Sequence, residues 1–182
     1  MTDRPNDALL RFGKAFALIL QGVCALAGGV ALLLIPIVPL ASQDMLPEFL
    51  DLNDLPIIEA SPLSVFSIAL MLAMILAALF YFFGKMRALI KSVGEGDPFI
   101  PENARRLNAM AWLLLGVQVL TVLVGGLRLY LVNLVDDAAN GRASIDVSFY
   151  DLDGMLMVII LFILARVFRH GAAMRDDLEG TV

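Results

Sequence analysis

The chain has 182 residues, of which 60% are hydrophobic and 17% are charged. This apolar share is well above that of ordinary water-soluble domains, which excludes a single soluble globular domain. The formal net charge is -5, but acidic and basic residues are segregated along the chain, so the sum describes no single surface. We therefore predict an integral membrane protein that forms one domain over residues 1–182.

A helix needs about 20 largely apolar residues to cross a bilayer. In chain order, the predicted spans are residues 15–40, 62–84, 107–130 and 148–168. The apolar stretch of the fourth span is short because Asp153 and Arg169 bound it. We therefore expect this helix to begin near Ser148 and Arg166 to extend its guanidinium toward the lipid headgroups. The predicted fold class is an all-α, integral membrane four-helix bundle.

The placement of Lys and Arg predicts the orientation, because short cytoplasmic connections carry an excess of these residues. Of the 13 Lys and Arg residues, all except Arg128 and Arg142 fall at the N-terminus, in the connection 85–106 (the elbow), or near the tail 169–182. The connections 41–61 and 131–147 are instead rich in Asp and Glu. We expect both termini and the elbow in the cytoplasm and these two loops outside.

Several polar and small residues within the spans predict packing between helices. Gln21 and Gln118 are expected to form hydrogen bonds between helices, and Arg128 is expected to pair at the outer interface with Asp151 or Asp153. Small residues recur at four-residue spacing, as in Ala69, Ala73 and Ala77, in Ala25 and Gly29, and in Thr121 and Gly125. Such stripes allow close helix contacts and make a homo-oligomer possible. Pro36 and Pro39 are expected to end or kink the first helix.

A GxGD motif at residues 94–97 and a Tyr-Asp pair at residues 150–151 together look like the signature of an intramembrane aspartyl protease. Such an enzyme needs two carboxylates within hydrogen-bond reach of each other. The predicted topology places Asp97 on the inner side and Asp151 on the outer side, about 30 Å apart across the hydrocarbon core. The motifs also occur in reversed order, so we do not expect this activity.

The remaining reactive side chains predict no catalytic residue, cofactor or metal site. The single cysteine, Cys24, lies inside an apolar run, and the one histidine, His170, follows the fourth span. A lone histidine does not form a metal site, and Gly94 and Gly96 lack the strand and helix that a phosphate-binding loop requires. We expect a protein that is not an enzyme.

The elbow has the pattern of a helix, a break and a second helix. The second span is expected to continue through Lys91, the break to fall at Gly94 to Pro98, and a new helix to start with Pro101 and Glu102. Phe99 and Ile100 are apolar residues in this polar turn, which either anchor the turn in the membrane interface or contact a cytoplasmic partner. Candidate partner-binding residues are Gly96, Asp97, Pro98, Phe99, Ile100, Asn103, Arg105, Arg106, Gly171, Arg175 and Glu179. In either case Arg105 and Arg106 suit anionic lipid headgroups.

Two segments carry a resemblance to a known family. In the elbow, a glycine, a Pro-Phe pair, a Glu-Asn pair and basic residues lead into a span, and here they are Gly96, Pro98, Phe99, Glu102, Asn103, Arg105, Arg106 and Leu107. At the C-terminus, Phe168-Arg169-His170-Gly171 is followed by the closing residues 174–182. With these segments the chain resembles, over nearly its whole length, the small bacterial four-span membrane proteins classed as domain of unknown function 2975. The resemblance implies a multi-pass protein of the bacterial inner membrane, often encoded beside a small helix-turn-helix repressor.

Two hypotheses of function follow. In the first, the protein is a non-enzymatic membrane scaffold or regulator that binds a cytoplasmic partner such as a helix-turn-helix protein, without binding nucleic acid itself. In the second, it is a small transport or toxin-immunity protein that acts through its acidic outer loops. The expected partners are thus the lipid bilayer, a cytoplasmic protein and a second copy of the chain.

Overall fold

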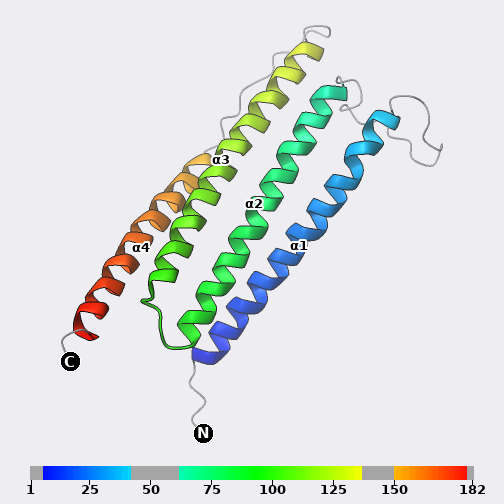
Figure 1. The fold of residues 1–182 in the computed structure, drawn as a ribbon. Coiled ribbons are helices and arrows are strands. Elements are labelled where there is room, and N and C mark those ends of the chain that lie inside the picture. Colours follow the sequence, from blue (N-terminus) through cyan, green and yellow to red (C-terminus); the bar gives the residue numbers. More distant parts are fainter. Residues whose placement is uncertain (1–5, 42–61, 137–149, 180–182) are drawn as a thin grey trace. The chain divides into compact units, whose positions relative to one another are not determined.

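The computed structural model describes residues 6–41, 62–136 and 150–179, and within them every residue outside the turn at 95–100 lies in one of four α-helices (Figure 1). The helices are α1 (Asn6–Ala41), α2 (Pro62–Gly94), α3 (Pro101–Asp136) and α4 (Tyr150–Glu179). Each contains a stretch long and apolar enough to cross a membrane, namely Ala8–Leu33, Phe66–Gly94, Pro101–Leu127 and Asp153–Leu178. The predicted all-α class with four candidate spans is confirmed.

The observed bounds of α1, α2 and α3 can be compared with the predicted ones. α2 continues through Lys91 to Gly94, and α3 starts at Pro101 with Glu102 in its first turn, as predicted. α1 passes through Pro36 and ends at Ala41, two residues after Pro39, so Pro36 does not end the helix, and the alternative of a kink at these prolines stays a prediction. Each proline removes one donor, but the other amide groups have no water to bond in a bilayer, which favours continuing the helix.

The chain divides into two compact units, each built from parts of several helices. The first, which we call the elbow unit, comprises Met1–Cys24, Ala78–Gln118 and Phe149–Val182. The second unit comprises Ala25–Ala77 and Val119–Ser148. All the contacts that carry the candidate site lie within the elbow unit.

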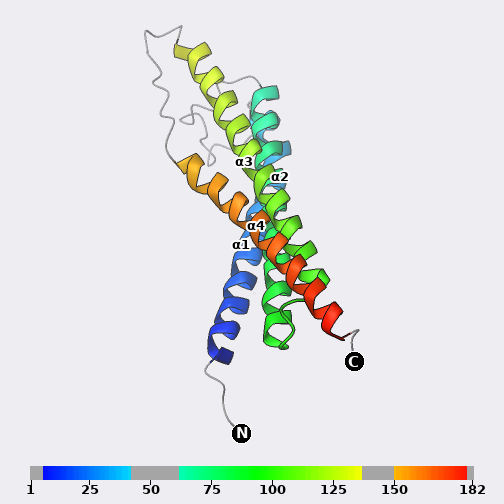
Figure 2. The same ribbon diagram turned by 90° about the vertical axis from the view of Figure 1, so that its left-hand side faces the viewer.

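The core of the elbow unit lies between the first half of α3 and the middle of α4, and Figure 2 shows these two helices crossing each other. Leu107, Met110 and Ala111 of α3 pack with Leu161 and Ala165 of α4. Around them lie partly buried side chains from three helices, Phe82, Met86, Leu89, Leu114, Phe162 and Phe168. This small core holds together α3 and α4, the two helices that lie on either side of the candidate site.

Glycines in the second unit differ in what surrounds them. A Cβ built at Gly28 would lie 3.8 Å from Leu76 Cβ, which is an ordinary packing distance between α1 and α2. The same construction at Gly29 and Gly125 meets no described atom within 4 Å. Of the predicted small-residue positions, these two therefore do not mark a close contact within the described part of the chain.

Candidate functional site

The end of α2 is closed by hydrogen bonds of the Schellman type. Gly96 N donates to Val93 O at 3.2 Å and Asp97 N donates to Ser92 O at 3.3 Å. Gly96 has a φ of 90°, a left-handed conformation that glycine adopts without the cost that a Cβ would add. The turn therefore reverses the chain at a position that the sequence had marked as a break.

The start of α3 uses proline and backbone groups. Pro101 occupies the first turn, where a missing N–H costs nothing, and Glu102 places a negative charge at the positive end of the helix dipole. The amide N–H of Asn103 donates to Ile100 O at 3.0 Å. Six residues, 95–100, thus separate α2 from α3, and hydrogen bonds hold this segment at both ends.

Asn103 is the centre of a buried polar network between α2, the turn and α3. It is 0% exposed. Its Nδ2 donates to Pro98 O at 2.8 Å, while its Oδ1 accepts from Arg106 Nη1 at 2.8 Å and lies 2.9 Å from Ser92 Oγ. Exchanging the amide oxygen and nitrogen would set an N–H against the guanidinium donor and an oxygen against Pro98 O, so the network allows only one orientation of the amide.

Ser92 and Arg106 complete this network on the side of α2. The Ser92 hydroxyl carries one proton and has two acceptors in reach, Asn103 Oδ1 and Leu89 O at 2.8 Å. Arg106 Nη1 also donates to Ala88 O at 3.2 Å. The guanidinium of Arg106 is therefore directed onto α2, whereas Arg105 is 80% exposed in its side chain and pairs with Glu102, at 3.7 Å.

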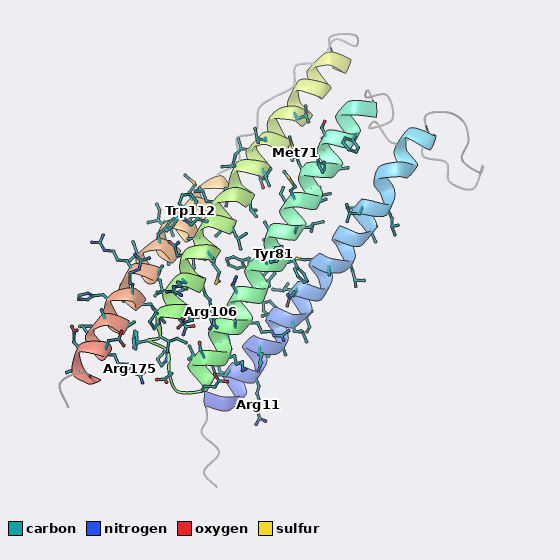
Figure 3. The ribbon with its side chains drawn as sticks, viewed as in Figure 1. Arg11, Met71, Tyr81, Arg106, Trp112 and Arg175 are labelled. Carbon is teal, nitrogen blue, oxygen red and sulfur yellow. The ribbon has the colours of Figure 1, made fainter. Side chains whose placement is uncertain are left out.

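The end of α4 covers the turn. Arg175 Nη1 donates to Asp97 Oδ1 in an ion pair between α4 and the turn, and Figure 3 shows Arg175 directed toward the turn. The rings of Phe99 and Phe168 have centroids 5.2 Å apart. A Cβ built at Gly171 would lie 2.7 Å from Phe99 Cδ1, so only glycine leaves room for the ring at this position.

The structure thus brings most of the predicted partner-binding residues together, but several face inward. Asn103 and Arg106 belong to the buried network, and Asp97 is paired with Arg175. Phe99 stays 43% exposed, with part of its ring against Phe168 and Gly171. The side chain of Glu179 lies outside the described residues.

The predicted outer ion pair also falls mostly outside the described residues. The side chains of Arg128 and Asp151 are not among those described, and Asp153, which is, lies exposed near the start of α4. The loops that carry the other outer acidic residues, 42–61 and 137–149, likewise lie outside the described residues.

The two membrane glutamines each lie against a glycine of the next helix. A Cβ built at Gly84 of α2 would lie 3.3 Å from Gln21 Nε2 of α1. One built at Gly154 of α4 would overlap the carboxamide of Gln118 of α3. Each glycine therefore makes room for a polar side chain between a pair of helices, which agrees with a packing role for both glutamines.

Sequence reasoning missed four residues of this region. Ser92 joins the buried network and Phe168 packs on Phe99, while Met174 and Leu178 are 53% and 72% exposed near the end of α4. A signal for Met174 and Leu178 was present, because they follow Gly171 by three and seven residues and so share its helix face. Their apolar character is unusual in a segment that also holds Arg175, Asp176 and Asp177.

The polar side chains of the site pair with one another and with the backbone. No group of three or more His, Cys, Asp or Glu side chains that could hold a metal ion occurs among the described residues. Within the same residues, no buried side-chain nitrogen or oxygen lacks a hydrogen-bond partner. The polar network is thus satisfied among the described residues, and it fixes the turn on which Phe99 stays exposed.

The comparisons with known proteins give one match. The model of the family described as "Protein of unknown function (DUF2975)" matches residues 41–182, which is more than three quarters of the chain and includes the elbow and the tail. The match begins after the first predicted span, whereas the resemblance was expected to cover nearly the whole chain. No curated protein and no solved structure matches the chain.

Proposed function

The chain belongs to this family of four-span membrane proteins, and we propose that it is a non-enzymatic regulator whose elbow and tail together bind a soluble cytoplasmic protein. The observation that supports this most is the closure of the end of α4 over the turn, through Asp97 with Arg175 and Phe99 with Gly171. Two segments that are far apart in the sequence form one surface there. A surface that is fixed before the partner arrives loses less conformational freedom on binding.

The proposed orientation places this surface in the cytoplasm of a bacterium, at the inner membrane. The elbow holds Lys85, Arg87, Lys91, Arg105 and Arg106, and the adjoining end of α4 holds Arg166, Arg169 and Arg175. Basic residues in short connections favour retention on the cytoplasmic side. On this orientation the protein keeps both termini inside.

Three exposed apolar side chains form the contact that we propose for the partner, and we call them the apolar triad. Phe99 contacts Gly171, and Met174 and Leu178 lie on the helix face of Gly171. The charges of Arg175, Asp176 and Asp177 favour a position of the last two turns of α4 outside the hydrocarbon region, and on that placement bilayer burial does not account for Met174 and Leu178. Clusters of exposed apolar residues with a charged rim are typical of protein interaction sites.

A small helix-turn-helix protein is the partner that we propose, and this identity rests on the family resemblance. An amphipathic helix of such a protein can lay its apolar face on the apolar triad while charged groups at the rim set its register. Binding would hold the regulator at the membrane and away from DNA, so the membrane protein itself contacts no nucleic acid.

The test is site-specific photo-crosslinking in the native host. A photoreactive residue replaces Leu178 in one variant and Ile163 in a control, because both positions are well exposed on α4 but Ile163 lies in the uncharged run between Asp153 and Arg166. We expect a crosslinked helix-turn-helix protein from position 178 and none from position 163. Met174→Glu should abolish the crosslink, whereas Asp176→Asn, on the opposite helix face, should preserve it. A position 178 that captures no cytoplasmic protein would contradict the proposal.

A further inference from the structure

Trp112 of α3 and Phe162 of α4 form an aromatic pair at the surface of the elbow unit. Their ring centroids are 5.5 Å apart with planes at 85°, an edge-to-face contact. Trp112 is 61% exposed, and Figure 3 shows it on α3 beside α4. Exposed tryptophan is typical of the membrane interface, where the indole meets both acyl chains and headgroups.

The helix register places arginines from both helices on the same side as this aromatic pair. α3 and α4 run in opposite directions here, since Phe99 before α3 contacts Phe168 near the end of α4. Arg105 precedes Trp112 by seven residues, and Arg169 follows Phe162 by seven residues. Each arginine therefore lies on the same helix face as its aromatic residue, two helical turns closer to the segment 95–100. Arg166 follows Phe162 by four residues and lies one turn along the same path.

All three arginines, which we call the arginine set, present their charge outward. Arg105, Arg166 and Arg169 are exposed. Arg105 has one ion pair, with Glu102 at 3.7 Å, between two largely exposed side chains, which is a weak interaction. No described carboxylate forms an ion pair with Arg166 or Arg169. The surface therefore combines three guanidinium groups with the apolar rings of Trp112 and Phe162.

We propose that this surface binds one anionic phospholipid. Guanidinium groups match the geometry of a phosphate and retain their charge at the membrane surface. Arg105 and Arg169 lie two helical turns, or about 10 Å along the axis, from the aromatic pair. When a phosphate contacts these arginines, Trp112 and Phe162 therefore lie at the level of the glycerol esters and upper acyl chains. Basic groups between membrane helices recognise anionic headgroups by this combination. The proposal needs neither a protein partner nor a particular orientation, so it stands apart from the proposed function.

The chain contains a single tryptophan, so the fluorescence of Trp112 reports on this surface alone. The full chain is reconstituted into phosphatidylcholine vesicles that contain a small, equal fraction of either brominated phosphatidylglycerol or brominated phosphatidylcholine. Bromine quenches tryptophan only on contact, so the ratio of the two quenching efficiencies gives the relative affinity of the site. We expect a preference for phosphatidylglycerol of about fivefold or more, since one basic residue near an anionic surface contributes about that factor.

Two sets of substitutions distinguish a local lipid-binding site from a general attraction of anionic lipids to the basic end of the protein. The triple variant Arg105→Gln, Arg166→Gln, Arg169→Gln should lower the preference to about one, as expected when the basic contributions are removed. Its quenching by brominated phosphatidylcholine should stay unchanged, which shows that Trp112 still faces lipid. A control with the same loss of charge on α2, Lys85→Gln, Arg87→Gln, Lys91→Gln, should keep the preference.

Three results would overturn the proposal. One is equal quenching of the native chain by the two brominated lipids. Another is a preference that survives in the arginine variant. The third is a preference that the α2 control loses to the same extent, because the effect would then belong to the overall charge and not to this surface.

Discussion

Ser92 Oγ lies 2.9 Å from Asn103 Oδ1, a contact that joins the last turns of α2 to the first turn of α3. The same amide satisfies Pro98 O and Arg106, so one buried side chain holds the turn from three directions. Hydrogen bonds of this kind fix a loop more firmly than its own backbone can, because the loop has few bonds of its own.

Substitution of Asn103 should therefore destabilise the protein. Asn103→Ala removes the amide and leaves Pro98 O, Arg106 and Ser92 without this partner, at an expected cost of about 2 kcal/mol in the free energy of unfolding. The measurement is equilibrium unfolding in mixed detergent micelles. Asn108→Ala, on the same helix but in none of these bonds, is the control and should change the free energy by less than about 0.5 kcal/mol. Equal effects of the two substitutions would show that the network contributes no stability.

The contact between Gly171 and Phe99 predicts a coupled pair. Gly171→Val should push the Phe99 ring from its place and cost about 2 kcal/mol, as overpacking does. In a variant that already carries Phe99→Ala, the same valine has space, so its cost should fall by at least about 1 kcal/mol. A double-mutant cycle on unfolding free energies measures this difference. Additive effects would mean that the end of α4 does not rest on the turn.

Gly154 and Gln118 predict a second coupled pair, deeper in the apolar part of the elbow unit. Gly154→Ala should force the Gln118 side chain out of its position between α3 and α4 and cost about 1 kcal/mol or more, against the helix propensity that alanine gains. Gln118→Ala should rescue the variant. Gly116→Ala is the matched control, since a Cβ there meets no described atom within 4 Å, and it should be neutral or slightly stabilising. Thermal unfolding in detergent, followed by circular dichroism, ranks the native chain and the three variants, and a Gly154→Ala variant as stable as Gly116→Ala would contradict the prediction.

The helices could be predicted from the sequence because their signal is local. Long apolar runs, the glycines near Gly94 and the Pro101-Glu102 start each specify their structure through neighbouring residues alone. The continuation of α1 through Pro36 agrees with the predicted span 15–40, and its physical reason is the cost of leaving other backbone groups unpaired in a bilayer. Local rules for water-soluble helices weigh that cost too lightly.

The arrangement of the site was harder to predict, because it depends on contacts between distant segments. Asn103 was grouped with surface residues on account of its polarity, yet it shares a helix face with Leu107, Met110 and Ala111, which are buried. That spacing was visible in the sequence and indicates a buried polar residue. The contact of Arg175 with Asp97 had no such signal, because a sequence separation of 78 gives no register for the two segments.

The closure of α4 over the turn also has a consequence for biosynthesis. A ribosome completes α2, the turn and α3 well before it adds Phe168, Gly171 and Arg175, and chain segments fold in the order in which they emerge. A growing chain therefore displays Phe99 and Asp97 without the helix that later covers part of them. Only the finished polypeptide has both halves of this surface, so a ligand that requires both halves distinguishes completed molecules from those still attached to the ribosome.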